Sequence, residues 1–124
     1  MLIVKDVSIR NNINFNNLKC LNVDKHTILL EKEKEVLLVF KHAINGCEGI
    51  SFDQIDQLGD PKLNQTSHLT QWSIKKVPVF ISINGKEVET TIWNGSNDFV
   101  VFLTRDKYIN KQRIDYIRGP RLSI

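Results

Sequence analysis

The C-terminal stretch of the sequence combines residue types that bind phosphates with residue types that stack on bases. Residues 105–124 contain six basic and two acidic residues, a net charge of +4, while the whole chain carries +3, so the residues before 105 sum to −1. Lys and Arg neutralise phosphates, and tyrosine rings offer stacking platforms. The candidate contact residues in this stretch are Arg105, Lys107, Tyr108, Lys111, Arg113, Tyr116, Arg118 and Arg121.

The same stretch also has a purely structural interpretation. If residues 113–118 form a strand, alternate side chains point to opposite faces, so Arg113 and Arg118 do not line up in one stripe. Edge strands carry charge to prevent unwanted pairing with other chains, which accounts for most of the pattern. We therefore expect a charged edge that can serve as a contact surface, in preference to a dedicated nucleic-acid reader.

Trp93 is a further candidate for binding because it lies at the end of a predicted hairpin, directly before Asn94-Gly95. Aromatic residues at loop ends often anchor interfaces. A tryptophan that closes the hydrophobic core is the competing interpretation.

Other residues with chemical potential form no convincing site. His42, Cys47 and Glu48 surround a Gly-rich turn and could form a thiolate pair, but a loop with a small buried thiol is the simpler interpretation. The carboxylates at positions 53, 56 and 60 would share one helix face and could bind a divalent ion, but a solvated helix face is the simpler interpretation. No zinc spacing, phosphate-binding loop or nucleophile elbow is present. We expect no enzymatic activity, no metal and no cofactor.

Composition places the chain among ordinary globular proteins. Its 124 residues, 41% hydrophobic and 25% charged, are enough for a single domain spanning residues 1–124. Cys20 and Cys47 are too few for a disulfide framework, and two reduced thiols are favoured over one bridge. The N-terminus does not resemble a signal peptide, and no apolar run is long enough to span a membrane. We expect a soluble, cytoplasmic protein.

The clearest structural pattern is a β-hairpin around Asn84-Gly85. Two runs rich in β-forming residues, 77–83 and 86–92, flank this pair, and Asn-Gly suits the positive φ angles of a type I′ turn. The implied register opposes Ile83 to Lys86, and the residues that should share the buried face are Val77, Val79, Ile81, Val88 and Ile92.

Two more strands are predicted after this hairpin. Residues 99–103 are apolar on both faces, as in a strand buried on both sides, and residues 113–118 end at Gly119-Pro120. Together with the hairpin they predict an antiparallel meander of three or four strands over residues 77–118.

The N-terminal half is less clear. Residues 2–9 are typical of a strand, the Asn-rich residues 11–17 of a loop, and residues 18–23 of another possible strand. Residues 27–44 fit either a hairpin or a helix. The hairpin is favoured because five consecutive apolar residues would surround a helix on all sides.

Two short helices are expected in mid-chain. Residues 51–59 begin with a capping box and end at a glycine. Asp60-Pro61 then suits the start of a second helix over residues 61–73, which would present Leu63, Leu69 and Trp72.

These patterns predict a β-rich α+β fold, with about five to seven mainly antiparallel strands and one or two short mid-chain helices. Because no catalytic cluster or cofactor motif is visible, we expect a small binding protein that blocks or escorts a partner protein, as immunity proteins do with toxins. The alternative is a nucleic-acid- or nucleotide-binding accessory protein that uses residues 105–121. A homodimer formed through an edge strand is also open, and no membrane partner is expected.

Overall fold

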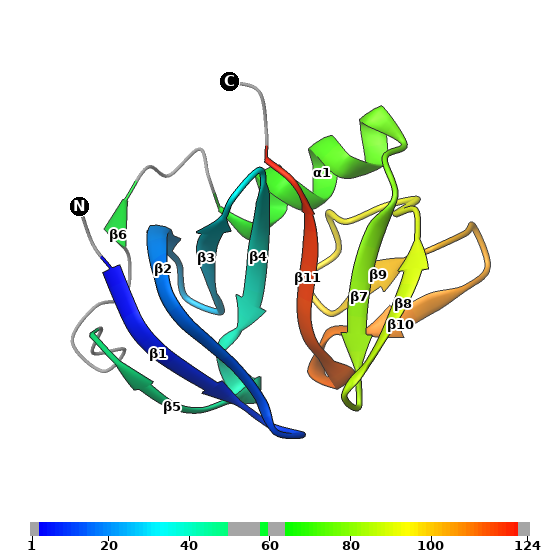
Figure 1. The fold of residues 1–124 in the computed structure, drawn as a ribbon. Coiled ribbons are helices and arrows are strands. Elements are labelled where there is room, and N and C mark those ends of the chain that lie inside the picture. Colours follow the sequence, from blue (N-terminus) through cyan, green and yellow to red (C-terminus); the bar gives the residue numbers. More distant parts are fainter. Residues whose placement is uncertain (1–2, 50–57, 60–63, 122–124) are drawn as a thin grey trace.

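The computed structural model describes residues 3–49, 58–59 and 64–121. Nine strands of this part form one antiparallel sheet in the order β5-β1-β2-β3-β4-β11-β7-β8, with β6 attached to β2, and β9 and β10 form a separate pair (Figure 1). The β-rich α+β fold is therefore confirmed, with more strands than expected. The elements are β1 (Ile3–Ile9), β2 (Ile13–Val23), β3 (Thr27–Lys32), β4 (Glu35–Phe40), β5 (Ile44–Glu48), β6 (Leu58–Gly59), α1 (Gln65–Lys75), β7 (Val79–Ile83), β8 (Lys86–Thr90), β9 (Val100–Phe102), β10 (Tyr108–Asn110) and β11 (Ile114–Pro120).

The strands β3 and β4 are the centre of the molecule. They form the hairpin favoured for residues 27–44, in which Thr27 pairs with Phe40. Their apolar runs are continuous because both faces of this hairpin are covered: Leu29 and Leu38 lie in one hydrophobic cluster, while Leu30 lies in another.

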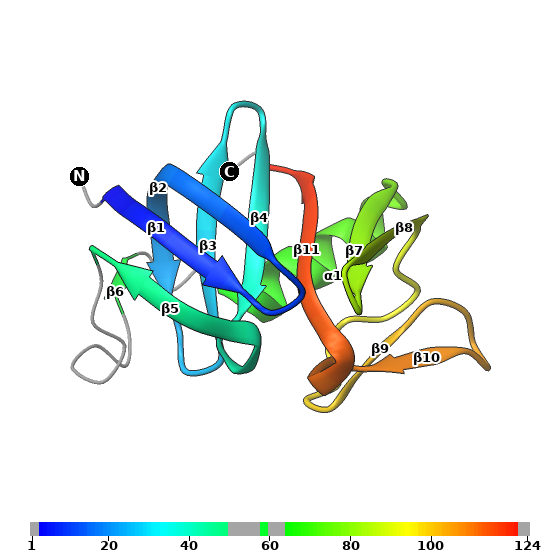
Figure 2. The ribbon, with the colours of Figure 1, turned by 60° about the horizontal axis from the view of Figure 1, so that its bottom comes forward.

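The two clusters lie on opposite faces of the central strands. Figure 2 shows β1 and β5 in front of β3 and β4, with α1 behind them. The first core lies on the α1 side and contains Leu29, Val36, Leu38, Phe40, Leu69, Trp72, Val79, Ile81, Ile92, Val101, Ile114 and Ile117. The second core lies on the β1 side and contains Val4, Val7, Ile9, Cys20, Val23, Ile28, Leu30, Leu37, Val39, Ala43 and Tyr116.

The expected loop over residues 11–17 is wrong, because most of it belongs to β2. Only Asn11 and Asn12 turn the chain, with φ angles of 67° and 61° that asparagine tolerates. After that turn Ile13 and Phe15 pack against the second core. Burial of these alternating apolar side chains outweighs the low strand preference of the asparagines between them.

The helix α1 confirms the second of the two expected mid-chain helices, although it begins later than predicted. Asn64 is its N-cap, accepting a hydrogen bond from the Ser67 amide at 2.8 Å. Leu69 and Trp72 are buried as expected. Asp60 and Leu63 lie outside the described residues, and so does most of the expected helix over 51–59, whose last two residues form β6 instead.

The expected C-terminal meander is wrong in its connectivity. β9 and β10 pair with each other, while β11 inserts between β4 and β7 (Figure 1). β11 supplies Ile114 and Ile117 to the first core and Tyr116 to the second. Because both of its faces are buried in this way, β11 lies inside the sheet with a strand paired to each edge. The run 99–103 is not buried on both sides, since Phe99 is 76% exposed.

The hairpin of β7 and β8 has the predicted register, with Ile83 opposite Lys86 and Ile81 opposite Val88. Its turn has positive φ at Asn84 and Gly85. Burial of Val88 was predicted and is wrong, because β8 is the outer strand of the sheet and Val88 is 48% exposed. Val79, Ile81 and Ile92 are buried, and Val77 is partly buried against the first core.

A fully buried carboxylate joins two distant turns to β11. Asp115, in β11, accepts hydrogen bonds from Arg10 Nε at 2.6 Å, Ser82 Oγ at 3.0 Å and the Gly85 amide at 3.2 Å. The β-bulge between Ile114 and Tyr116 lies at this residue. Since a buried charge must be paired and hydrogen-bonded, this network fixes the β1–β2 and β7–β8 turns relative to β11.

Candidate functional site

An exposed row of aromatic side chains crosses the small β9–β10 sheet. Tyr108 of β10 pairs with Phe102 of β9, and on the other edge of β9 the Trp93 amide donates to the Phe102 carbonyl at 2.8 Å. The rings follow this pairing, with centroids 6.0 Å apart for Trp93 and Phe102 and 5.6 Å apart for Phe102 and Tyr108, both in edge-to-face contact. We call these three residues the aromatic row.

The aromatic row faces outward because the opposite face of β9 and β10 is buried. Successive side chains of a strand point to opposite sides, so Val101 enters the first core while Phe102 points away from it. Trp93 is 52% exposed and Tyr108 is 60% exposed. Neighbouring rings of this size, left in contact with water, are typical of the centre of a protein interface.

A basic turn adjoins the aromatic row. The Leu103 amide donates to the Lys107 carbonyl at 2.8 Å, and the Thr104 hydroxyl accepts from the amides of Asp106 and Lys107 at 3.3 and 3.0 Å. These bonds order the turn that carries Arg105. Arg105 and Lys107 are exposed, and neither forms an ion pair with a carboxylate in the described part of the chain.

Two of the predicted contact residues are used inside the fold. Arg118 binds Glu87 through Nε at 2.8 Å and Nη2 at 3.0 Å, approaches Glu35 at 3.2 Å, and lies 3.9 Å above the Phe80 ring. Tyr116 is almost fully buried, and its hydroxyl donates to Glu87 at 2.5 Å. Burial and this hydrogen bond raise the pKa of Tyr116.

The remaining predicted residues divide between internal and external roles. Arg121 pairs with Glu31, and Lys111 is only 8% exposed. Arg113 is exposed, and it follows Lys111 by two residues in a short 3-10 turn. Thus Trp93, Arg105, Lys107 and Tyr108 come together around β9 and β10, whereas Tyr116, Arg118 and Arg121 do not join them as an open surface.

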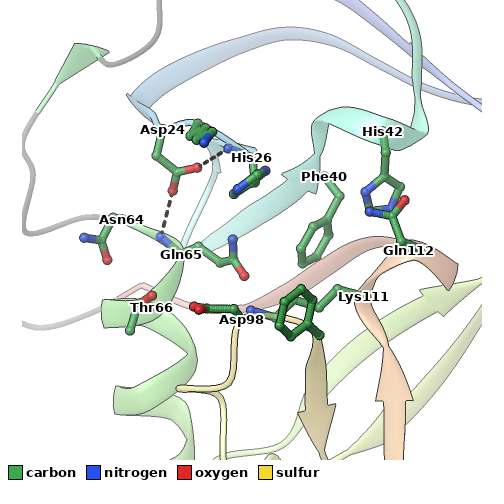
Figure 3. Close-up of a pocket in the computed structure, with 12 residues that line it drawn as sticks. Asp24, His26, Phe40, His42, Asn64, Gln65, Thr66, Asp98, Lys111 and Gln112 are labelled. Atoms are coloured by element: carbon green, nitrogen blue, oxygen red, sulfur yellow. Dashed lines mark hydrogen bonds between the residues drawn. The ribbon is translucent and has the colours of Figure 1, made fainter.

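Lys111 lies in a pocket of about 550 Å³ beside the start of α1, which we call the α1 pocket (Figure 3). Its walls include Phe40 of β4, Gln65 of α1 and Asp98 from the segment before β9. Burial lowers the pKa of Lys111, and the carboxylates of Asp98 and Asp24 oppose that shift.

One wall of the α1 pocket is a carboxylate that already caps α1. Asp24 accepts hydrogen bonds from the His26 and Thr27 amides at 2.9 and 2.7 Å, from the Thr27 hydroxyl at 2.8 Å, and from the Gln65 amide at 3.1 Å. A carboxylate at this place is stabilised by the positive end of the helix dipole. On another wall, the His42 ring stacks on Phe40, with centroids 5.4 Å apart, and Nε2 donates to the Ile114 carbonyl at 2.9 Å.

The other chemical candidates remain without a site. Cys20 and Cys47 form no disulfide with each other, and burial raises the pKa of the Cys20 thiol to about 11, which disfavours the reactive thiolate. Asp53, Asp56 and Asp60 lie outside the described residues. In the ranges that the structure describes, no group of three or more His, Cys, Asp and Glu side chains is arranged to hold a metal ion, and no helix is both long and apolar enough to cross a membrane.

Sequence reasoning missed Phe102 and the α1 pocket. The sequence predicts that Phe102 belongs to a strand buried on both faces. Only its pairing with Tyr108 and the hydrogen bond that its carbonyl accepts from the Trp93 amide reveal the aromatic row. The pocket residues Asp24, Gln65 and Lys111 come from three separate turns or caps, so no local spacing connects them.

No protein-family model matches this chain, and no curated protein sequence is significantly similar to it.

Proposed function

We propose that this protein binds a partner protein through the aromatic row, and that it blocks or escorts that partner as immunity proteins do. The observation that carries the proposal is the contiguous set of Trp93, Phe102 and Tyr108 rings, of which Trp93 and Tyr108 are each more than half exposed. Interface hot spots are enriched in Trp and Tyr, and a few such residues supply most of the binding free energy.

The partner should present an apolar groove with an acidic border. Arg105 and Lys107 flank the row on an ordered turn and have no described carboxylate as a partner, so their charges are available to a ligand. Rim charges of this kind increase the association rate and select the orientation of the partner more than they increase affinity.

A protein partner is favoured over nucleic acid because much of the basic charge of the C-terminal stretch is neutralised internally. Arg118 and Arg121 are held by Glu87, Glu35 and Glu31. A phosphate-binding groove needs a continuous line of cations. Here Arg105, Lys107 and Arg113 are the exposed basic residues left among the candidates of residues 105–121. Nucleic acid stacked on Trp93 and Tyr108 remains the second candidate.

The proposal is tested by affinity capture from the native cells with three forms of the protein. The wild type should retain one stoichiometric protein partner, and the double variant Trp93→Ser/Tyr108→Ser should lose it. Ile74→Ser is the matched control. Ile74 is 66% exposed on α1, so this substitution removes exposed apolar surface outside the aromatic row.

Retention of the partner by the double variant would contradict the proposal. Loss of the captured material after nuclease treatment, with binding that weakens steeply as salt rises, would instead support the nucleic-acid alternative.

A further inference from the structure

Two nearly buried polar residues in the α1 pocket can contact a ligand. Gln65 is 8% exposed, its Oε1 accepts no hydrogen bond from a described residue, and its carboxamide points from the start of α1 into the pocket (Figure 3). Lys111 is equally buried and forms no ion pair with the carboxylates that the structure describes. Leaving the buried Gln65 acceptor unpaired costs free energy that a bound ligand can recover, and Lys111 places a cation beside it.

The α1 pocket is built around these two groups. Its volume of about 550 Å³ lies within the ordinary range for small-molecule sites. Lys111 offers N–H donors to an anionic oxygen, and the Gln65 carboxamide offers an acceptor together with a donor, whichever way the amide is turned. The ligand must therefore present both an acid group and an N–H group.

The charge of the lining indicates a ligand without net charge. Lys25 and Lys111 balance Asp24 and Asp98 among the ionised residues of the pocket. Asp24 already occupies the positive end of α1, where a phosphate would otherwise bind. A polyanion such as a nucleotide is therefore disfavoured relative to a zwitterion.

Aromatic surface completes the pocket. Phe40, stacked with His42, forms one wall, and Phe99, which is largely exposed, forms another. These rings can cover an apolar body attached to the polar groups of a ligand.

We propose that the α1 pocket binds a small zwitterion of the amino-acid class. The carboxylate of the ligand contacts the Lys111 ammonium, its amino group donates to Gln65 Oε1 close to Asp98, and its side chain lies against Phe40 and Phe99. This site is independent of the aromatic row, so the inference stands or falls separately from the proposed protein partner.

The probes are the free amino acids, each compared with its own amide, which lacks the carboxylate, and with inorganic phosphate. Binding is followed by NMR on the ¹⁵N-labelled full chain and by calorimetry. At least one amino acid should bind with one-to-one saturation and shift the amide signals of Gln65, Phe99 and Gln112, and its amide should bind at least about tenfold more weakly.

Variants connect that binding to Lys111 and Gln65. Lys111→Met and Gln65→Leu should each weaken it at least about tenfold. Lys107→Met, which removes an exposed lysine outside the pocket, should not. Asp98→Asn provides a second, exposed position at which binding should weaken. The inference is overturned if no amino acid binds the wild type, if phosphate or the amides bind equally well, or if the pocket variants retain full affinity.

Discussion

Arg118 donates to Glu87 from Nε at 2.8 Å and from Nη2 at 3.0 Å. These two hydrogen bonds link β11, which carries Arg118, to β8, which carries Glu87, across the intervening strand β7. The Tyr116 hydroxyl donates to the same carboxylate at 2.5 Å. This cluster shows how a basic stretch of sequence divides between two tasks. Part of its charge stabilises the sheet, and the exposed Arg105, Lys107 and Arg113 are left for contacts.

Replacing Glu87 with Gln should flatten the pH dependence of stability in acid. The hydrogen bond from Arg118 is the main cause that holds the pKa of Glu87 below its ordinary value of 4.5. Stability from this group is therefore present above pH 4.5 and is lost as pH falls through the lowered value in the folded protein.

The difference should be about 1 kcal/mol or less in the free energy of unfolding, because both side chains are partly exposed. Urea denaturation at neutral and acidic pH measures it. Glu89→Gln, at an exposed position on the same strand, is the control. Identical pH profiles for the two variants would show that the Glu87 cluster adds no stability.

Gly85→Val should destabilise the protein by at least about 1 kcal/mol, since a β-branched residue resists positive φ. The φ angle of Gly85 is +81°, and an added Cβ would lie 3.0 Å from the Asn11 Cβ. Gly46→Val is the matched control, because nothing lies within 4 Å of a Cβ at that position. Thermal and urea denaturation of both variants measure the difference. An equal loss of unfolding free energy in both variants would contradict the turn geometry.

His68 should make the protein less stable below about pH 6.5. The side chain is fully buried against Trp72 and its Nε2 has no partner among the described residues, so burial lowers its pKa from the ordinary value of 6.5. The unfolded chain then takes up a proton that the folded protein resists. The stability that comes from keeping His68 neutral is fully present above pH 6.5. It declines as pH falls toward the lowered pKa of His68 in the folded protein, by up to about 1.4 kcal/mol per pH unit.

The variant His68→Phe removes this titration and keeps an aromatic ring beside Trp72. Unfolding free energies measured from about pH 7.5 to about pH 5 should fall less steeply for the variant than for the wild type. The burial of His42, whose pKa is also lowered, leaves a remaining slope in both proteins. An unchanged slope in His68→Phe would refute the contribution of His68.

Local chemistry made some elements predictable from the sequence. Asn84-Gly85 specified its turn and register, and the apolar run at 36–40 indicated a strand because it could not form one face of a helix. Distant pairings decided the rest. β2 forms because its alternating Ile13 and Phe15 find the second core, and β11 leaves the meander because it buries side chains on both faces.

The candidate site was predictable in the same partial way. Trp93, Arg105, Lys107 and Tyr108 were recognised by residue type and proximity to turns. Their gathering depends on Phe102, whose outward direction follows from the pairing of β9 with Trp93 and β10. Gln65 and Lys111 could not be connected from sequence, because 45 positions separate them and the start of α1 meets the β10–β11 turn only in the fold.

Loss of either exposed ring of the aromatic row should leave the fold intact. Trp93→Ala and Tyr108→Ala each remove one edge-to-face contact with Phe102, worth about 0.5–1.5 kcal/mol. Thermal denaturation should therefore show only a small decrease in Tm, and unfolding of either variant would mean that the row is part of the core.

Photo-crosslinking in the native cells tests the central claim most directly. The photoreactive p-benzoylphenylalanine is introduced in place of Tyr108, of Trp93, or of the exposed Ile74 on α1 as a control. Positions 93 and 108 should each yield one discrete adduct of the same mass, which protease destroys and nuclease leaves intact, while position 74 should yield none. Adducts that disappear with nuclease, or a protein adduct formed only from position 74, would contradict a protein partner bound at the aromatic row.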